Sequence, residues 1–447
     1  MHSGETHSAS DPDWSSRRLH FVGIGGAGMS GLALIARSLG AQVTGSDRAR
    51  SSYTERLERQ GIVPAVGHDG ANVPDGAQVV YSSAVPPENP ERQAANGREI
   101  HRSQLLAEIA ALRKCIAVTG THGKTTTSGM IVAALRGCGF DPPYVIGGEL
   151  RCTGSNAGWG TGEWIVIEAD ESDRSLLALA PDIAVLTSAE LDHHSTYRSK
   201  LELEQTFKAF MASARVAAVV WDRPELRALC PPGTRTYDAP ELILTALGST
   251  FRSSGVQVEL SVPGAHNAIN AAGALTAATL AGADPRCAAR ALAEFRGARR
   301  RFQLLGETGA GIPVYDDYAH HPTEVQAAIA AARTLQPGRV VAVFQPHLYS
   351  RTQALARELG QALATADVGA VVSVYPARER AADFPGVEGL LVARAAAQAG
   401  GGRQTAWLPA FEDVRRFLSA ILRSGDLCLL MGAGDIDSLG ASLVASS

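Results

Sequence analysis

The feature that most constrains this chain is a glycine-rich loop between an apolar run and a helix-like segment. The apolar run ends at Val118, the loop is Gly120-Thr-His-Gly-Lys-Thr-Thr-Thr127, and the helix-like segment covers residues 128–135. A strand, a glycine loop and a helix N-terminus direct backbone N–H groups at phosphate oxygens. Lys124 then reaches the outer phosphates and the Thr125 hydroxyl ligates Mg²⁺. The motif predicts an α/β nucleotide-binding domain, although Val118 replaces the first glycine of the general pattern.

An acidic cluster follows a second apolar run. Trp164-Ile-Val-Ile leads directly into Glu168-Ala-Asp-Glu-Ser-Asp173. Carboxylates this close repel one another unless a cation lies among them, and oxygen ligands beside a phosphate loop favour Mg²⁺. A third strand leads to Glu190-Leu-Asp-His-His194. Here His193 could ligate a metal, act as a base or only form hydrogen bonds, and spacing leaves all three roles open.

A different glycine motif opens the chain. A strand beginning near Leu19 enters Gly23-x-Gly25-x-x-Gly28, and the next strand ends at Asp47. This pattern fits a dinucleotide fingerprint with an acid near the ribose, and it fits a nucleotide-sugar diphosphate equally well. Ser82 and Ser83 follow a third strand, where open α/β sheets place ligand contacts, but turn capping would also explain them.

The second half of the chain continues the α/β pattern. Asn267 and Asn270 lie three residues apart near the start of an alanine-rich helix, so their amides share one face. They could read a base edge or cap the helix. The basic turn Arg299-Arg-Arg301 could neutralise phosphate charge or simply be solvated. Beyond it, strands at 339–344, 368–374 and 426–431 alternate with helices at 323–335 and 354–365, which predicts another parallel sheet.

Composition limits the class of protein. The 447 residues, with 45% hydrophobic and 19% charged, fit a globular protein of two to four domains. A net charge of -4 argues against nucleic-acid binding, and the absence of a long apolar stretch argues against a membrane span. Residues 1–18 are polar, unlike a signal peptide, and we expect a disordered tail. Six scattered cysteines without a CxxC pair favour reduced thiols and a cytoplasmic location.

The motifs together resemble those of one family, the Mur ligases. The resemblance rests on Gly120–Thr127, Glu168–Asp173, His266-Asn-x-x-Asn270, Arg300-Arg-Phe302 and Asp316-Asp-Tyr-Ala-His-His-Pro322, in that order. Two further stretches, Gly23-Ile-Gly-Gly-Ala-Gly-Met29 and Phe344-Gln-Pro-His347, resemble the branch that joins L-alanine to UDP-N-acetylmuramate. The resemblance runs from about His20 to Leu439.

The family resemblance implies an α/β protein of three domains. They are a Rossmann-like UDP-sugar-binding domain (19–112), a central ATP-binding domain with a parallel sheet of the phosphate-loop type (113–312), and a Rossmann-like C-terminal domain that brings the amino acid (313–447). The implied reaction phosphorylates the lactyl carboxylate to an acyl phosphate, which the alanine amine then attacks. The implied ligands are UDP-N-acetylmuramate, L-alanine, ATP and Mg²⁺, with no nucleic acid or membrane partner, in a monomer or homodimer.

The resemblance also implies roles for individual residues. Residues expected to bind the UDP-sugar are Gly25, Gly26, Ala27, Gly28, Asp47, Ser82 and Ser83. Residues expected to bind ATP are Gly120, Thr121, His122, Gly123, Lys124, Thr125, Thr126, Asn267, Asn270, Arg301 and Asp317. The expected metal ligands are Thr125, Glu168 and His193. The expected catalytic residues are Lys124, Glu168, His193 and His320, and the expected amino-acid ligands are His347 and Arg351.

Two positions depart from the family pattern. Ser188 stands where the family usually has asparagine, and Leu348 stands where it usually has an arginine near the amino-acid carboxylate. Leu348 therefore leaves Arg351 and His347 to hold that charge. The rival interpretations are a muropeptide-recycling ligase that joins a peptide to the same sugar nucleotide, a nicotinamide dehydrogenase using Gly23–Gly28 and Asp47, and a non-catalytic nucleotide-binding regulator.

Overall fold

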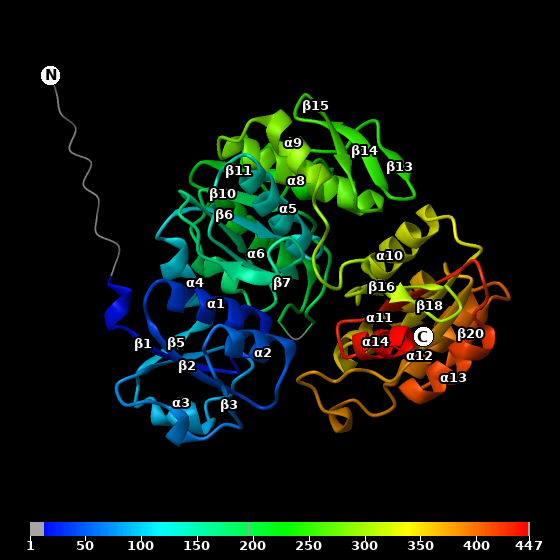
Figure 1. The fold of residues 1–447 in the computed structure, drawn as a ribbon, viewed down its shortest axis with the longest axis horizontal. Coiled ribbons are helices and arrows are strands. Elements are labelled where there is room, and N and C mark those ends of the chain that lie inside the picture. The colour runs from blue at the N-terminus through cyan, green and yellow to red at the C-terminus, as the bar shows by residue number, and fades with distance from the viewer. Residues whose placement is uncertain (1–12, 195, 446–447) are drawn as a thin grey trace.

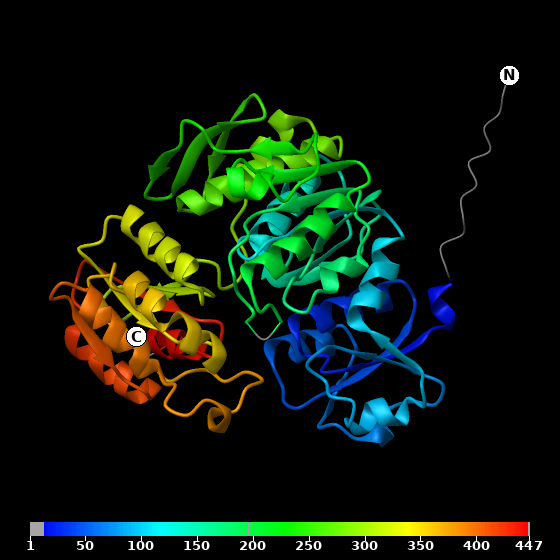
Figure 2. The ribbon, with the colours of Figure 1, turned by 180° about the vertical axis from the view of Figure 1, so that it is seen from behind.

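The computed structural model describes residues 13–194 and 196–445, and these form three α/β domains, each built on a mostly parallel sheet. The predicted fold class is confirmed. Figure 1 shows the N-terminal domain in blue, the central domain in cyan to green, and the C-terminal domain in yellow to red. Seen from both sides, the first and third domains lie against the central one (Figure 2). Within the described residues, no helix has the length and apolar character needed to cross a membrane.

The N-terminal sheet contains five parallel strands in the order β3-β2-β1-β4-β5. Its strands are β1 (Arg18–Val22), β2 (Gln42–Asp47), β3 (Ala65–Val66), β4 (Gln78–Tyr81) and β5 (Glu99–His101), and its helices are α1 (Ala27–Ser38), α2 (Ser52–Arg59), α3 (Pro90–Ala94) and α4 (Arg102–Ala110). The carboxylate of Glu91, on α3, connects this helix to strand β2. Glu91 is fully buried and accepts hydrogen bonds from Ser46 Oγ (2.5 Å) and Asn72 Nδ2 (2.7 Å).

The prediction that residues 1–18 form a disordered tail is partly wrong. Residues 1–12 lie outside the described residues, but residues 13–18 are ordered. Asp13 caps the short 3-10 helix Trp14–Ser16, Trp14 is only 2% exposed, and Arg18 begins β1. Arg17 lies over the Trp14 ring and pairs with Glu108. Burial of one large aromatic side chain therefore anchors a segment whose overall polarity suggested disorder.

The central sheet contains seven strands in the order β12-β11-β10-β6-β9-β7-β8, of which only β8 runs antiparallel to its neighbour. The strands are β6 (Lys114–Thr119), β7 (Tyr144–Leu150), β8 (Ser155–Gly158), β9 (Trp164–Glu168), β10 (Ile183–Leu186), β11 (Ala217–Trp221) and β12 (Arg235–Tyr237). The helices are α5 (Lys124–Gly137), α6 (Lys200–Ala212), α7 (Pro224–Arg227), α8 (Ala265–Leu280) and α9 (Pro285–Ala293). Small residues along α8 let it pack closely against α5, with every alanine from Ala271 to Ala278 fully buried.

A small antiparallel sheet, which we did not predict, is attached to the central domain. It consists of β13 (Ile243–Thr245), β14 (Gly248–Ser253) and β15 (Val256–Leu260). Phe251 and Val258 bury its inner face, whereas Leu247 at one turn is 79% exposed.

The C-terminal sheet contains six strands in the order β16-β17-β21-β18-β19-β20, with only β16 antiparallel. The strands are β16 (Gln303–Glu307), β17 (Pro313–Asp317), β18 (Arg339–Phe344), β19 (Val368–Val371), β20 (Gln404–Trp407) and β21 (Asp426–Met431). The helices are α10 (Pro322–Thr334), α11 (Tyr349–Leu363), α12 (Gly389–Ala399), α13 (Phe411–Ile421) and α14 (Asp437–Ala445). The helix predicted at 354–365 thus begins five residues earlier, directly after Leu348.

Candidate functional site

The glycine loop between β6 and α5 is shaped by two glycines with positive φ. Gly120 has φ +133° and Gly123 has φ +81°, both in a region that side-chain-bearing residues rarely adopt. A Cβ atom on Gly120 would lie 2.2 Å from Thr187 Oγ1, and one on Gly123 would lie 2.5 Å from Asn270 Oδ1. The loop therefore packs directly against β10 and α8, which places Asn270 beside the phosphate loop.

Lys124 points back across this loop. Its ammonium donates to the Gly120 carbonyl at 2.6 Å and contacts both carboxylate oxygens of Glu171, at 2.9 and 2.8 Å. Burial alone would lower the pKa of Lys124, but the charges of Glu171, Asp170 and Glu168 outweigh it and raise the pKa. The amine is therefore a permanent positive charge. It lies in a cavity that is also lined by Thr125, Glu168 and His193.

Thr125 and Glu168 form an oxygen-rich pair at the start of α5. Thr125 Oγ1 donates to Glu168 Oε1 at 3.0 Å, and Gly147 N donates to Glu168 Oε2 at 2.6 Å. Burial raises the pKa of Glu168 above its usual range although Lys124 opposes the shift. A hydroxyl and a carboxylate oxygen are the hard donors that Mg²⁺ prefers, so this pair fits the predicted metal.

His193 lies elsewhere in the same cavity. Its Nε2 is 3.2 Å from Glu171 Oε1 and 3.7 Å from Asp192 Oδ2. Burial lowers the pKa of His193, but the Glu171 and Asp192 carboxylates outweigh it and the net shift is upward. The structure thus pairs His193 with Glu171, whereas Thr125 and Glu168 pair with each other.

The cation that neutralises much of the acidic cluster is an arginine from another domain. Arg102, at the start of α4, lies 2.9 Å from Asp170 Oδ2 and 2.8 Å from Asp173 Oδ2. Burial would raise the pKa of Asp170, but Arg102 and then Lys124 hold it well below its usual range. The cation expected among these carboxylates is therefore the Arg102 guanidinium for Asp170 and Asp173. Both side chains instead join the N-terminal and central domains.

His320, after β17, supplies a neutral imidazole. Its Nδ1 lies 2.9 Å from the Tyr318 carbonyl, and its Nε2 lies 4.0 Å from Asp192 Oδ2. Burial lowers the pKa of His320 to about 4. Because the carbonyl can only accept, Nδ1 carries the proton and Nε2 is left with its lone pair. This is the tautomer that a proton acceptor requires.

Four predicted ATP-binding residues line a second cavity that continues from the glycine loop. Asn267, Asn270, Arg301 and Asp317 lie on its wall, together with His266, which we did not predict as a ligand. The Asn267 amide donates to the Pro263 carbonyl at 2.7 Å. The Asp317 carboxylate accepts from Phe302 N and Ala319 N, each at 2.7 Å, and burial raises its pKa to about 6. Asp317 therefore shapes its own loop in addition to facing the cavity.

The predicted amino-acid ligands lie beyond β18, His347 in the loop after the strand and Arg351 in the first turn of α11. Arg351 forms a two-pronged ion pair with Asp192, at 2.8 and 3.0 Å, and both side chains are buried. His347 Nδ1 lies 3.1 Å from Arg351 Nη1. Leu348 is 5% exposed and has φ +70°, an uncommon conformation for leucine. The Arg351 guanidinium thus links the central and C-terminal domains.

A residue that we did not predict, Arg378, lines the same cavity as Lys124 and Arg351. It is exposed, and among the described residues its guanidinium has no hydrogen bond or ion pair. Its loop is fixed to the segment before α11, because Leu348 N donates to the Tyr375 carbonyl at 2.9 Å and the His347 and Tyr375 rings stack 5.7 Å apart. In the sequence, nothing distinguishes Arg378 from other loop arginines.

The predicted UDP-sugar residues lie at the carboxyl ends of β1, β2 and β4. Gly25 N donates to Asp47 Oδ2 at 2.8 Å, so Asp47 holds the first glycine loop in place. Ser83 Oγ donates to Asp173 Oδ2 at 2.9 Å and thereby joins this edge to the acidic cluster. The remaining predicted residues, Gly26, Ala27, Gly28 and Ser82, lie on the same edge of the sheet.

The three domains match three family models in chain order. Residues 18–114 match the model described as Mur ligase family, catalytic domain; residues 118–278 match the Mur ligase middle domain; and residues 300–434 match the Mur ligase, glutamate ligase domain. The UDP-N-acetylmuramate–L-alanine ligase of Kineococcus radiotolerans is 44% identical, with 99% of this chain and 98% of the relative aligned. The enzyme of that name from Rubrobacter xylanophilus is 43% identical, with 96% and 99% aligned.

Solved structures give the same result at the level of the fold. The UDP-N-acetylmuramate–alanine ligase of Thermotoga maritima superposes with a TM-score of 0.82 at 26% identity, over 96% of this chain and 98% of that one. A murein peptide ligase from Psychrobacter arcticus shares the fold with a TM-score of 0.71 at 24% identity, over 96% and 98%. The phosphate loop, its magnesium-compatible oxygen pair and these full-length matches lead to one conclusion: the chain belongs to the Mur ligase family.

Proposed function

We propose that this protein uses ATP to join L-alanine to the lactyl carboxylate of UDP-N-acetylmuramate, through an acyl phosphate. The observation that carries the proposal is one cavity in which two domains meet. Lys124, Thr125 and Glu168 of the central domain line it together with His320 and Arg351 of the C-terminal domain. Full-length relatives that are 41–44% identical carry the name of this activity, which favours it over the muropeptide-recycling alternative.

The first step brings two anions together, the carboxylate and the γ-phosphate. Such a reaction depends on positioned positive charge rather than on a covalent nucleophile of the protein. Lys124 supplies one charge, and Arg301, which lines the same cavity, supplies another. For Lys124 to reach the phosphates, its contact with Glu171 must loosen. The Glu171 carboxylate would then retain His193 as its partner, 3.2 Å away.

Mg²⁺ would be held by the Thr125 hydroxyl and the Glu168 carboxylate, whose oxygens already lie 3.0 Å apart. The bound ion supplies charge neutralisation on the phosphate oxygens. His193 lies on the same cavity and is our candidate for a second metal contact.

The second step needs a deprotonated amine. Alanine enters as an ammonium ion, and a neutral imidazole can accept its proton. His320 fits this role because its Nε2 lone pair is unprotonated at neutral pH and the side chain lines the cavity. Asp192, 4.0 Å from that nitrogen, would stabilise the imidazolium that forms.

The carboxylate of the incoming alanine needs a cation as well. Arg351 is already bound by both oxygens of Asp192, and Leu348 offers no charge. We therefore assign the carboxylate to Arg378, assisted by His347, since the Arg378 guanidinium has no hydrogen bond or ion pair to any described residue and lines the same cavity. The UDP moiety would bind at the glycine loop that Asp47 fixes, on the edge of the N-terminal sheet facing the central domain.

The test is phosphate release from ATP in the presence of Mg²⁺ and UDP-N-acetylmuramate, with L-alanine, glycine, L-serine or a muramyl-type tripeptide as acceptor. The proposal predicts release that requires both the sugar nucleotide and L-alanine. Release with the tripeptide alone would instead identify a recycling ligase, and release without any sugar nucleotide would contradict the proposal.

A further inference from the structure

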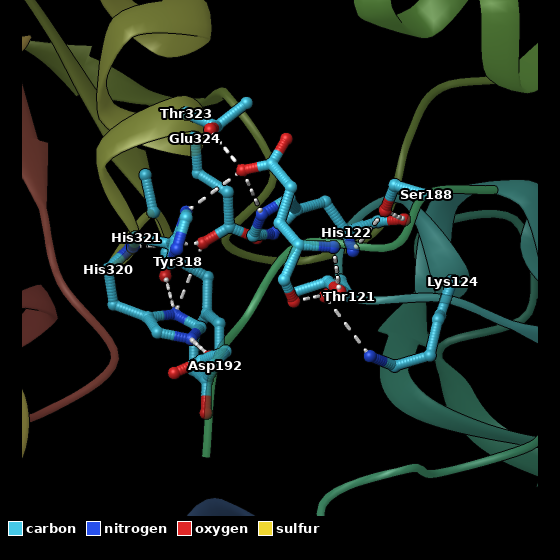
Figure 3. A network of polar contacts seen from close by, with 12 residues as sticks. Thr121, His122, Lys124, Ser188, Asp192, Tyr318, His320, His321, Thr323 and Glu324 are labelled. Carbon is cyan, nitrogen blue, oxygen red and sulfur yellow. Dashed lines mark hydrogen bonds and ion pairs between the residues drawn. The ribbon is translucent and has the colours of Figure 1, made fainter. Parts of the chain in front are cut away.

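A second group of potential metal ligands lies beside the phosphate loop. His122 comes from the glycine loop, Glu190 from the segment after β10, and His321 from the segment after β17. His122 Nε2 is 3.5 Å from Glu190 Oε2, and His321 Nδ1 is 3.6 Å from the same oxygen. These three atoms all lie within 4.8 Å of one another. Figure 3 shows the two imidazoles and the Thr323 and Glu324 side chains gathered at this point.

The separations fit a tetrahedral ion. A Zn²⁺ ion bound at about 2.0–2.2 Å to nitrogen and oxygen places its ligand atoms roughly 3.3–3.6 Å apart at ideal angles. Both histidine–glutamate separations here match that spacing. The two imidazole rings have their centroids 4.5 Å apart, and their facing nitrogens lie within 4.8 Å of each other.

The ring nitrogens facing this point lack hydrogen bonds. Among the described side chains, His122 Nε2 and His321 Nδ1 are buried and have no hydrogen-bond partner. The His321 side chain is 7% exposed and that of His122 is 13% exposed. Both nitrogens face Glu190 Oε2 at ion-pair distance, 3.5 and 3.6 Å, so a metal ion at this point would replace a proton shared between the imidazoles and the carboxylate.

Neighbouring side chains orient these ligands as in known zinc sites. Glu324 Oε1 lies 3.3 Å from His122 Nδ1, on the far side of the ring from Glu190. A carboxylate behind a metal-ligating histidine fixes the ring orientation and raises its basicity. Thr323 Oγ1 donates to Glu190 Oε2 at 2.5 Å and fixes that carboxylate. The arrangement thus contains the three ligands and also the contacts that hold them in place.

We propose that His122, Glu190 and His321 bind a transition-metal ion of the Zn²⁺ class, separate from the magnesium pair of Thr125 and Glu168. Two imidazoles and one carboxylate select Zn²⁺ over Mg²⁺, which prefers oxygen ligands alone. The site opens on the cavity that we assign to the nucleotide. Since His321 belongs to the C-terminal domain and the other two ligands to the central domain, the bound ion ties the two domains together across the phosphate loop.

The experiment uses Co²⁺ as a spectroscopic substitute in the full chain, freed of any histidine tag and without nucleotide. The proposal predicts one equivalent of bound Co²⁺ with the intense visible absorption of tetrahedral geometry, lost on addition of Zn²⁺ but not of excess Mg²⁺. Glu190→Gln and His321→Ala should each abolish the spectrum. Glu324→Gln should weaken binding by about 10- to 100-fold, as expected for a supporting contact.

His194→Ala is the matched control, because His194 lies in the same segment as Glu190 but outside the cluster. Its spectrum should equal that of the unaltered protein, and circular dichroism should show every variant folded. A spectrum that survives Glu190→Gln and His321→Ala would overturn the proposal. So would a sulfur-to-cobalt charge-transfer band, which would place the ion on a cysteine, or an absence of Co²⁺ binding. None of these outcomes depends on the ligase activity.

Discussion

Replacing Arg378 by alanine should specifically weaken the use of L-alanine. A charge-assisted hydrogen bond is worth about 1.5–3 kcal/mol. Because Arg378 is exposed, solvent screening places the loss near the lower value. About 1.5 kcal/mol corresponds to roughly a tenfold increase in KM for L-alanine. The KM values for ATP and UDP-N-acetylmuramate should not change, since neither is assigned to this side chain.

The assay is steady-state phosphate release with each substrate varied in turn. Arg380→Ala is the matched control, because Arg380 is an exposed arginine two residues away that does not line the cavity. Arg378→Lys should recover part of the loss, since it keeps the charge but not the planar fork. If Arg378→Ala left the KM for L-alanine unchanged, or raised it no more than Arg380→Ala did, our reasoning about the carboxylate would be refuted.

Three further predictions concern the phosphate loop and the stability of the N-terminal domain. Lys124→Met should abolish phosphate release in protein that circular dichroism shows to be folded, although loss of the buried pair with Glu171 should lower the unfolding temperature. Retained activity would remove Lys124 from the mechanism. Gly123→Ala should weaken ATP binding in calorimetry because its Cβ would lie 2.5 Å from Asn270 Oδ1. Gly139→Ala, with a similar φ of +84° and open space around it, should not weaken ATP binding. Glu91→Gln should destabilise the N-terminal domain by about 1.5–3 kcal/mol at pH 7. Burial raises the pKa of Glu91, but its hydrogen bonds outweigh this and lower the pKa to about 2. Its stabilising effect is therefore complete above pH 4.5 and is lost as pH falls toward 2, so denaturation curves of the two proteins should converge in acid.

The family resemblance implied three α/β domains, and local sequence patterns predicted several of their strands. Strand β18 (Arg339–Phe344) and strand β21 (Asp426–Met431) occur with the predicted bounds, because continuous apolar runs are typical of buried parallel strands. The antiparallel sheet β13–β15 was missed. Strand β14 is rich in serine, threonine and glycine, and Ile243 and Leu247 remain exposed, so β13 and β14 carried little apolar signal. Strand β15 (Val256–Leu260) does alternate apolar and polar residues, and this signal was overlooked.

The site was predictable where one segment supplies the chemistry and not where distant segments meet. The phosphate loop contains its own lysine and threonine, so its geometry follows from the motif. The ion pairs of Arg102 with Asp170 and of Arg351 with Asp192 join different domains, and their spacing along the chain carries no signal. Arg378 enters the cavity through hydrogen bonds between two loops, which only the folded chain reveals.

The most direct test of the central proposal follows an oxygen atom. UDP-N-acetylmuramate labelled with ¹⁸O in the lactyl carboxylate is incubated with ATP, Mg²⁺ and L-alanine, and both products are analysed by mass spectrometry. An acyl phosphate transfers one carboxylate oxygen to the released phosphate, so our account predicts one ¹⁸O in each phosphate formed together with the L-alanyl product. Formation of that product with unlabelled phosphate would contradict the acyl phosphate mechanism, and absence of the product would contradict the function itself.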